Sequence, residues 1–80
     1  MADETNDIVA EMDKGWNEKI IFSVSDFKGK KYANIRIYYE DDEGAWKPTK
    51  KGITVAMDSF REFKERVEEL ESHLKEKGLI

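Results

Sequence analysis

The chain has 80 residues, of which 40% are charged, and its formal net charge is -4 at pH 7. A chain of this length forms one domain, and because so small a domain buries only about 60% of its unfolded surface, we expect its core to need a partner or a second copy. The absence of cysteine excludes disulfides and thiolate metal sites, and the absence of an apolar run near the roughly 20 residues of a membrane span excludes a transmembrane helix.

Residues 1–15 (MADETNDIVAEMDKG) are dominated by charge, with five acidic groups against one lysine. High charge and few apolar residues predict a disordered tail here, so that the domain comprises residues 16–80. The positions of Ile8, Val9 and Met12 leave an alternative open, because their spacing also suits one short amphipathic turn that docks on the domain or covers a basic groove.

Two strands are predicted next, at residues 17–25 (NEKIIFSVS) and 31–40 (KYANIRIYYE), where β-branched and aromatic residues alternate with polar ones. Residues 26–30 (DFKGK) connect them, and Gly29 can take the positive φ that turns the chain back. The second strand has an apolar face and a polar, aromatic face: Ala33, Ile35, Ile37 and Tyr39 on the first, and Tyr32, Asn34, Arg36 and Tyr38 on the second. We expect the apolar face to meet the core.

The acidic turn at residues 41–44 (DDEG) leads into a short third strand around residues 45–47. Pro48 cannot donate to a strand ladder, so the stretch after it belongs at a sheet edge or outside the sheet. A fourth strand is predicted at residues 52–56. Three adjacent carboxylates in the turn lack the ligand spacing of a calcium loop and indicate a solvated turn, so we expect neither a metal nor another cofactor.

After residue 56 the apolar period changes to that of a helix, predicted over residues 57–77. The residues of its apolar stripe are spaced 3, 4, 3 and 4 apart: Phe60, Phe63, Val67, Leu70 and Leu74. Asp58 or Ser59 can start the helix, Ser59 with Glu62 fits a capping box, and Gly78 suits the stop. The stripe is expected to pack on the sheet, with residues 70–80 able to reach a second subunit. The predicted fold is therefore α+β, a four-stranded antiparallel sheet followed by one C-terminal amphipathic helix.

Charge is unevenly distributed along the chain, since the formal charges of residues 1–18, 19–55 and 56–80 sum to -5, +3 and -2. In the central stretch, basic residues alternate with aromatic and β-branched ones. Such a surface suits flexible nucleic acid, because phosphates need cations and unstacked bases need aromatic faces. We favour phosphate binding for Lys47, Lys50 and Lys51, which recur on the surface that carries Arg36, over the alternative of a solvated edge.

The motifs SDFKGK, IRIYY, DDEG, WKP and KKGIT follow one another in this order between about residues 21 and 67. In this combination the chain resembles the single-stranded DNA-binding domain of the transcriptional coactivator family known as positive coactivator four, or p15. The resemblance implies a homodimer in which two curved sheets, each backed by its helix, form β-ribbon channels for single-stranded DNA. The acidic start differs from the serine-rich regulatory tail of eukaryotic members and indicates a bacterial-type relative.

The resemblance also implies site residues. Phe27 and Tyr39 correspond to base-stacking positions, and five cations correspond to phosphate contacts: Lys28, Lys30, Arg36, Lys50 and Lys51. Three positions depart from the family pattern: Ser25 replaces a basic residue, Tyr39 replaces a tryptophan, and Trp46 is an added aromatic, either an extra platform or a core residue. Strand alternation favours Tyr38 as the neighbour of Arg36, whereas the positional match favours Tyr39, and a β-bulge near the strand end would reconcile the two.

The sequence therefore predicts a sequence-independent single-stranded DNA-binding protein that acts on melted DNA in transcription, replication or repair, in the cytoplasm and associated with the nucleoid. No catalytic arrangement of side chains is evident, so we do not expect an enzyme. Two alternatives stay open. The same surface could bind single-stranded RNA, or the acidic tail and helix could make the protein an interaction adaptor.

Overall fold

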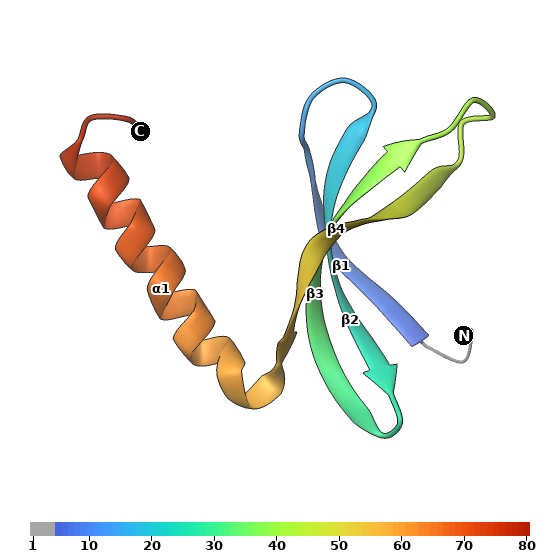
Figure 1. The fold of residues 1–80 in the computed structure, drawn as a ribbon, viewed down its shortest axis with the longest axis horizontal. Helices are drawn as coiled ribbons and strands as arrows, with labels where there is room; N and C mark the ends of the chain where they lie inside the picture. The colour runs from blue at the N-terminus through green and yellow to red at the C-terminus, as the bar shows by residue number, and fades with distance from the viewer. Residues whose placement is uncertain (1–4) are drawn as a thin grey trace.

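The computed structural model describes residues 5–80, which form a four-stranded antiparallel sheet followed by one helix (Figure 1). The elements are β1 (Thr5–Asp13), β2 (Glu18–Phe27), β3 (Lys30–Glu40), β4 (Trp46–Ala56) and α1 (Met57–Glu76). The strands pair in the order β1-β2-β3-β4, so each strand lies beside its predecessor in the sequence. The open sheet is curved, and the predicted fold class is confirmed.

The segment expected to be a disordered tail contains β1, and for residues 5–13 that expectation is wrong. β1 pairs with β2 from Thr5 opposite Asp26 to Asp13 opposite Lys19, and the register shifts between Ile8 and Ala10. This pairing satisfies the backbone groups along the edge of β2, which a disordered tail would leave open to water or to another chain. Residues 1–4 of the expected tail lie outside the described residues.

The two short strands expected on either side of Pro48 form the single strand β4. β4 is the edge strand next to β3, so the missing N–H of Pro48 is tolerated there. The register shifts beside it: Arg36 lies opposite Gly52, whereas Tyr38 lies opposite Pro48. The extra residues belong to β4, which bulges at residues 49–51 while β3 keeps its alternation.

Helix α1 follows β4 without a connecting loop. Its N-cap is Ala56, and no side-chain hydrogen bond caps the first turn, so the expected capping box of Ser59 and Glu62 is wrong. The C-terminal stop at Gly78 agrees with the prediction: its φ is 71°, and the Leu79 N–H donates to the Leu74 carbonyl over 2.9 Å. This left-handed glycine and its hydrogen bonds satisfy carbonyls that the helix end would otherwise expose.

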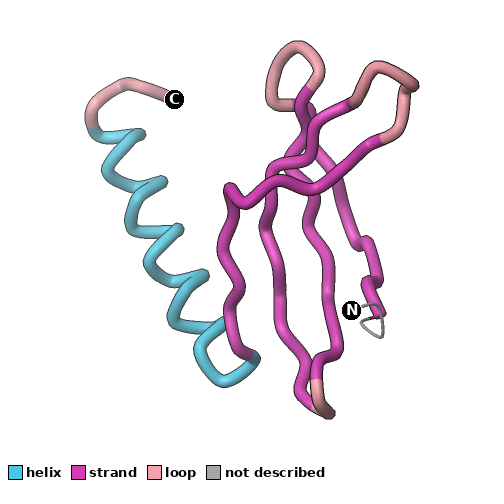
Figure 2. The backbone as a smooth tube through the Cα atoms, turned by 45° about the vertical axis from the view of Figure 1, so that its right-hand side comes forward, coloured by secondary structure: helices cyan, strands magenta, loops and turns pink. Residues whose placement is uncertain are grey.

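Only the first half of α1 lies near the sheet, and the helix diverges from it beyond that point (Figures 1 and 2). Phe60, Phe63 and Val67 face Phe22, Val24, Ala33 and Ile35 across an apolar hollow, so the predicted apolar face of β3 does meet the helix. The packing is loose, because no residue of α1 is buried and Leu70 is 57% exposed. Among the described apolar residues only Ile21 is buried, with 4% of its surface exposed.

The turns of the sheet divide between its two ends (Figures 1 and 2). The β1–β2 and β3–β4 turns lie at one end, and the β2–β3 turn lies at the other. We call the side of the sheet opposite α1 the groove face, and it carries Ser23, Ser25, Asn34 and Arg36.

Candidate functional site

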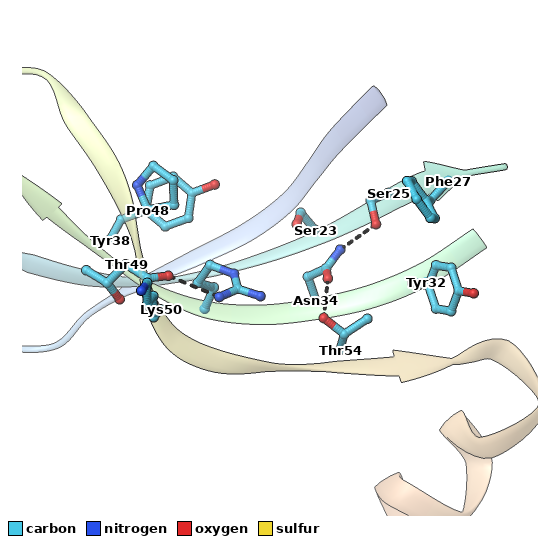
Figure 3. A pocket seen from close by; sticks show the side chains of 11 residues that line it. Ser23, Ser25, Phe27, Tyr32, Asn34, Tyr38, Pro48, Thr49, Lys50 and Thr54 are labelled. Carbon is cyan, nitrogen blue, oxygen red and sulfur yellow. Dashed lines mark hydrogen bonds between the residues drawn. The ribbon is translucent and has the colours of Figure 1, made fainter. Parts of the chain in front are cut away.

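A solvent-open hollow of about 700 Å³ crosses β2, β3 and β4 on the groove face (Figure 3). Its lining is polar and aromatic: Ser23, Ser25, Phe27, Tyr32, Asn34, Arg36, Tyr38, Pro48, Thr49, Lys50 and Thr54. The hollow arises because β2 and β3 place alternate side chains on this face, while their apolar neighbours turn toward α1. A linear, flexible ligand can lie in such a groove across the three strands.

Phe27 marks the end of the groove at the β2–β3 turn. It lies opposite Lys30, and only Lys28 and Gly29 connect the two strands. Both connecting residues have positive φ, 53° and 80°, which is the geometry of a type I′ hairpin turn. Phe27 is 44% exposed, and the Lys28 ammonium lies 5.3 Å from the centroid of its ring. The turn therefore presents an aromatic face with a cation beside it.

Tyr38, not Tyr39, lies in the groove beside Arg36. Tyr39 is opposite Glu18 and Lys47 on the other face of the sheet, where it is 38% exposed. Strand alternation identified the groove residue correctly, because the bulge lies in β4 and leaves β3 regular. The predicted stacking role of Tyr39 therefore has no support from the shape of this groove.

The β4 bulge brings cations to the groove. The Thr49 hydroxyl donates to the Ile37 carbonyl over 2.7 Å and accepts from the Lys51 N–H at 3.1 Å, which fixes the bulge. Arg36 donates to the Thr49 carbonyl over 3.0 Å, and Lys50 lines the hollow. Among the residues that the structure describes, none forms an ion pair with Arg36, Lys50 or Lys51. Their charges are thus available to an anionic ligand.

Gly52 holds β4 tightly against β3 next to the bulge. A Cβ at this position would lie 2.7 Å from the Ile35 carbonyl oxygen and 2.8 Å from the Arg36 Cα. Only glycine permits this approach, because both of these neighbours are backbone atoms that cannot rotate away.

Trp46 and Lys47, two predicted site residues, are engaged outside the groove lining. The Lys19 ammonium lies 4.5 Å from the centroid of a Trp46 ring and also pairs with Glu11 over 3.1 Å. Lys47 forms a 2.9 Å ion pair with Asp41. The structure thus assigns both residues contacts that stabilise the end of the sheet near the β3–β4 turn.

Asp41 organises that turn. One carboxylate oxygen accepts the N–H groups of Glu43 and Ala45, each over 2.9 Å, and the other pairs with Lys47. The hydrogen bond from Lys47, followed by that from the Ala45 N–H, holds the pKa of Asp41 below its ordinary value of 3.8. The same hydrogen bond raises the pKa of Lys47.

Acid is therefore expected to weaken this turn. Because the pKa of Asp41 is lowered by folding, its contribution to stability is complete above the ordinary value and is lost as the pH falls through the folded value. The variant Asp41→Asn keeps an acceptor oxygen but lacks the charge. Wild type should melt at a higher temperature than this variant near pH 6, and the gap should shrink toward pH 3. An equal gap at both pH values would contradict the assignment.

The sequence placed Tyr32 and Asn34 on the polar face but did not assign them to a site; Ser25 was named only as a departure from the family pattern, and Ser23 and Thr54 were not proposed as site residues. Three of these side chains are hydrogen-bonded across the strands: Thr54 donates to the Asn34 amide oxygen over 2.9 Å, and the Asn34 amide donates to the Ser25 hydroxyl over 2.8 Å. The alternation of side chains along β2 and β4 was the signal that could have identified these groove residues.

Within residues 5–80, no group of three or more His, Cys, Asp or Glu side chains is placed to hold a metal ion, and no helix is long and apolar enough to cross a membrane.

A family model described as Transcriptional Coactivator p15 (PC4) matches residues 13–66. A crystal structure of a PC4 homologue from Burkholderia pseudomallei superposes with a TM-score of 0.74 at 21% identity, covering 79% of this chain and 93% of that one. A bacteriophage T5 homologue of the eukaryotic transcription coactivator PC4, implicated in recombination-dependent DNA replication, gives a TM-score of 0.59 at 23% identity and covers 98% of this chain and 84% of that one. At these identities the two structures establish a shared fold.

Proposed function

The chain belongs to the transcriptional coactivator p15 (PC4) family, and on that premise we propose that it binds single-stranded DNA in the groove, largely without regard to sequence. One observation carries the proposal. A single hollow joins an exposed aromatic ring, Phe27, to the cations Arg36 and Lys50 and to a second ring, Tyr38.

The two kinds of side chain suit the two parts of a nucleotide. Stacking on an aromatic ring contributes about 1 to 3 kcal/mol per base and is tolerant of sequence, because every base has a π face. Arg36, Lys50 and Lys51 would contact phosphates at the bulge, and Lys28 and Lys30 would do so at the β2–β3 turn. Four or five such contacts predict that log K falls with log salt at a slope of about -3 for a single strand.

The proposal includes a homodimer formed through α1. The helix has no buried residue, and three members of its apolar stripe remain well exposed in the single chain: Phe60 at 40%, Val67 at 47% and Leu70 at 57%. Such a continuous apolar stripe favours burial against another surface of the same kind. A second copy would supply one and would bring two grooves into one particle, as the family resemblance implies.

The proposed setting is melted DNA during transcription, replication or repair, in the cytoplasm and associated with the nucleoid. The phage T5 homologue, implicated in recombination-dependent DNA replication, supports a replication role among these. The role is one of binding rather than catalysis. The adaptor alternative loses part of its basis, because residues 5–13 of the acidic segment form β1, whereas the helix it also relies on remains exposed.

Fluorescence anisotropy with a labelled oligothymidine and a duplex of equal length, at two salt concentrations, tests the function. The protein should bind the single strand tightly and with strong salt dependence, and the duplex much more weakly. Phe27→Ala should weaken single-strand binding about tenfold by removing one stacking surface. Trp16→Ala is the matched control, since Trp16 is 91% exposed in the turn at the opposite end of the sheet and should leave affinity unchanged.

Equal loss in both variants, or equal affinity for single strand and duplex, would contradict the proposal. Competition with an oligouridine RNA of the same length separates DNA from RNA as the preferred ligand. An RNA that competes better than the DNA would favour the RNA-binding alternative on the same groove.

A further inference from the structure

We propose that the groove contains a slot for one nucleobase, with Phe27 and Tyr32 as its walls and the hydrogen-bonded side chains of Ser25, Asn34 and Thr54 as its floor. The slot favours a base that presents two adjacent hydrogen-bond acceptors, such as guanine. This inference rests on the proposed single-stranded DNA binding and deepens it, because it adds a modest base preference to a groove that otherwise tolerates sequence.

The walls are spaced for a base. Phe27 is the last residue of β2, Tyr32 is opposite Ser25 on β3, and both side chains line the same hollow (Figure 3). The two residues are therefore diagonal neighbours on adjacent antiparallel strands, a relation that places their backbones about 7 to 8 Å apart and their Cβ atoms somewhat closer. A flat base in contact with a ring on each side, at about 3.5 to 4 Å from each, needs a similar separation between the two rings.

The floor is a directional relay across three strands, drawn as dashed lines in Figure 3. The Thr54 hydroxyl donates to the Asn34 amide oxygen over 2.9 Å, and the Asn34 amide nitrogen donates to the Ser25 hydroxyl over 2.8 Å. Asn34 is directly opposite Thr54 but diagonal to Ser25. In this relay the Asn34 amide oxygen faces Thr54 on β4, and the amide nitrogen faces Ser25 on β2.

This direction determines what the slot can offer a ligand. The Ser25 oxygen is used as an acceptor, so its own hydrogen remains free to donate, and the Asn34 amide has a second hydrogen. No other side chain or backbone group among the described residues accepts either hydrogen. Both groups are part of the solvent-open lining of the hollow rather than buried without a partner. The end of the relay beside Phe27 therefore presents two neighbouring donors.

Two neighbouring donors match two neighbouring acceptors. Guanine presents the acceptors O6 and N7 side by side, and an unpaired cytosine presents O2 and N3, whereas adenine pairs its N7 acceptor with an amino donor and thymine sets its O4 acceptor between a methyl group and the N3 donor. A thymine or adenine stacked between Phe27 and Tyr32 would keep its stacking energy and satisfy one donor. A guanine would satisfy both.

The test compares an oligothymidine of about 12 bases with the same strand carrying a few spaced guanines, a length within the usual range for one single-strand site. Wild type should bind the guanine-containing strand about fivefold more tightly, the low end expected for a two-point base contact in an open groove. Asn34→Ala should bring this ratio close to one and leave the salt slope unchanged. Ser25→Ala should reduce the ratio by removing one donor, and it serves in place of Asn34→Ala if that variant does not fold.

Lys50→Ala is the contrasting variant, since it should weaken binding to both strands equally, reduce the salt slope and leave the ratio unchanged. Two results would contradict the slot: equal wild-type affinities for the guanine-containing strand and the oligothymidine, or an affinity ratio that neither Asn34→Ala nor Ser25→Ala changes. In either case the relay would serve only to connect the strands. Neither result would touch the proposed function, which fails instead if wild type binds neither strand.

Discussion

Replacing Gly52 with alanine should cost about 3 kcal/mol of unfolding free energy, a large part of the stability of so small a domain. The new Cβ would meet the Ile35 carbonyl oxygen at 2.7 Å and the Arg36 Cα at 2.8 Å. Relief requires β4 to move away from β3, which breaks the ladder beside the bulge and displaces Lys50 and Lys51. Urea denaturation of wild type and Gly52→Ala measures this loss.

Gly29→Asn is the matched control. Gly29 has a φ of 80°, but a Cβ there meets no atom within 4 Å, and asparagine tolerates this backbone conformation better than most residues. Its cost should stay within about 1 kcal/mol. Equal urea midpoints for the two variants would show that close strand approach at position 52 contributes nothing special to stability.

Replacing Leu70 with glutamate should convert the proposed dimer into a monomer. In the single chain Leu70 is 57% exposed, so the new carboxylate should hardly disturb the fold of one copy. In a dimer packed through the apolar stripe of α1, the same carboxylate would be buried without a partner, at a cost of about 3 to 5 kcal/mol. Light scattering across a dilution series should show an increase in the dimer dissociation constant of at least about 100-fold.

Ser72→Glu adds the same charge on the opposite side of the helix and should leave the dimer intact. If both variants assemble like wild type, the stripe is not the interface. If wild type is itself monomeric at all concentrations, the homodimer is excluded from the proposed function.

The features that the sequence predicted correctly depend on strict alternation. In β3, side chains alternate between the two faces, which assigned Ala33 and Ile35 to the side of the helix. The same alternation assigned Asn34 and Arg36 to the groove. The register is well defined, because a slip by one residue would turn all the apolar side chains of the strand toward solvent. The same rule selected Tyr38 against the family position Tyr39. Alternation holds along β3 because the irregularity of the sheet lies in β4, and the stacking role of Tyr39 stays a prediction.

The errors have equally specific causes. β1 was mistaken for a tail because its acidic composition resembles disorder, and the register shift between Ile8 and Ala10 hides its period of two. β4 was divided into two strands because Pro48 and Gly52 normally interrupt strands, although an edge position and a close approach accommodate them here.

The contacts between side chains could not be predicted from the sequence. Lys47 pairs with Asp41, and Asn34 connects Ser25 to Thr54, only because of the way the strands are paired. Neither contact follows from the identity of the residues or from their spacing along the chain. The sequence therefore predicted neither the ion pair of Lys47 nor the hydrogen bonds of Asn34, and the site role of Lys47 stays a prediction.

The sequential strand order also determines how the chain can fold. Each ladder joins a strand to the one before it, so the sheet can form by closing three successive hairpins, without threading or a long crossover. Hairpins close in about 1 to 10 μs, and folds dominated by local contacts are fast. Within the described residues, α1 contacts only β3 and β4, so the four strands can pair before the helix docks on the sheet. The groove can therefore be complete before α1 docks on the sheet, and the proposed DNA binding would not depend on the rate at which the proposed dimer forms.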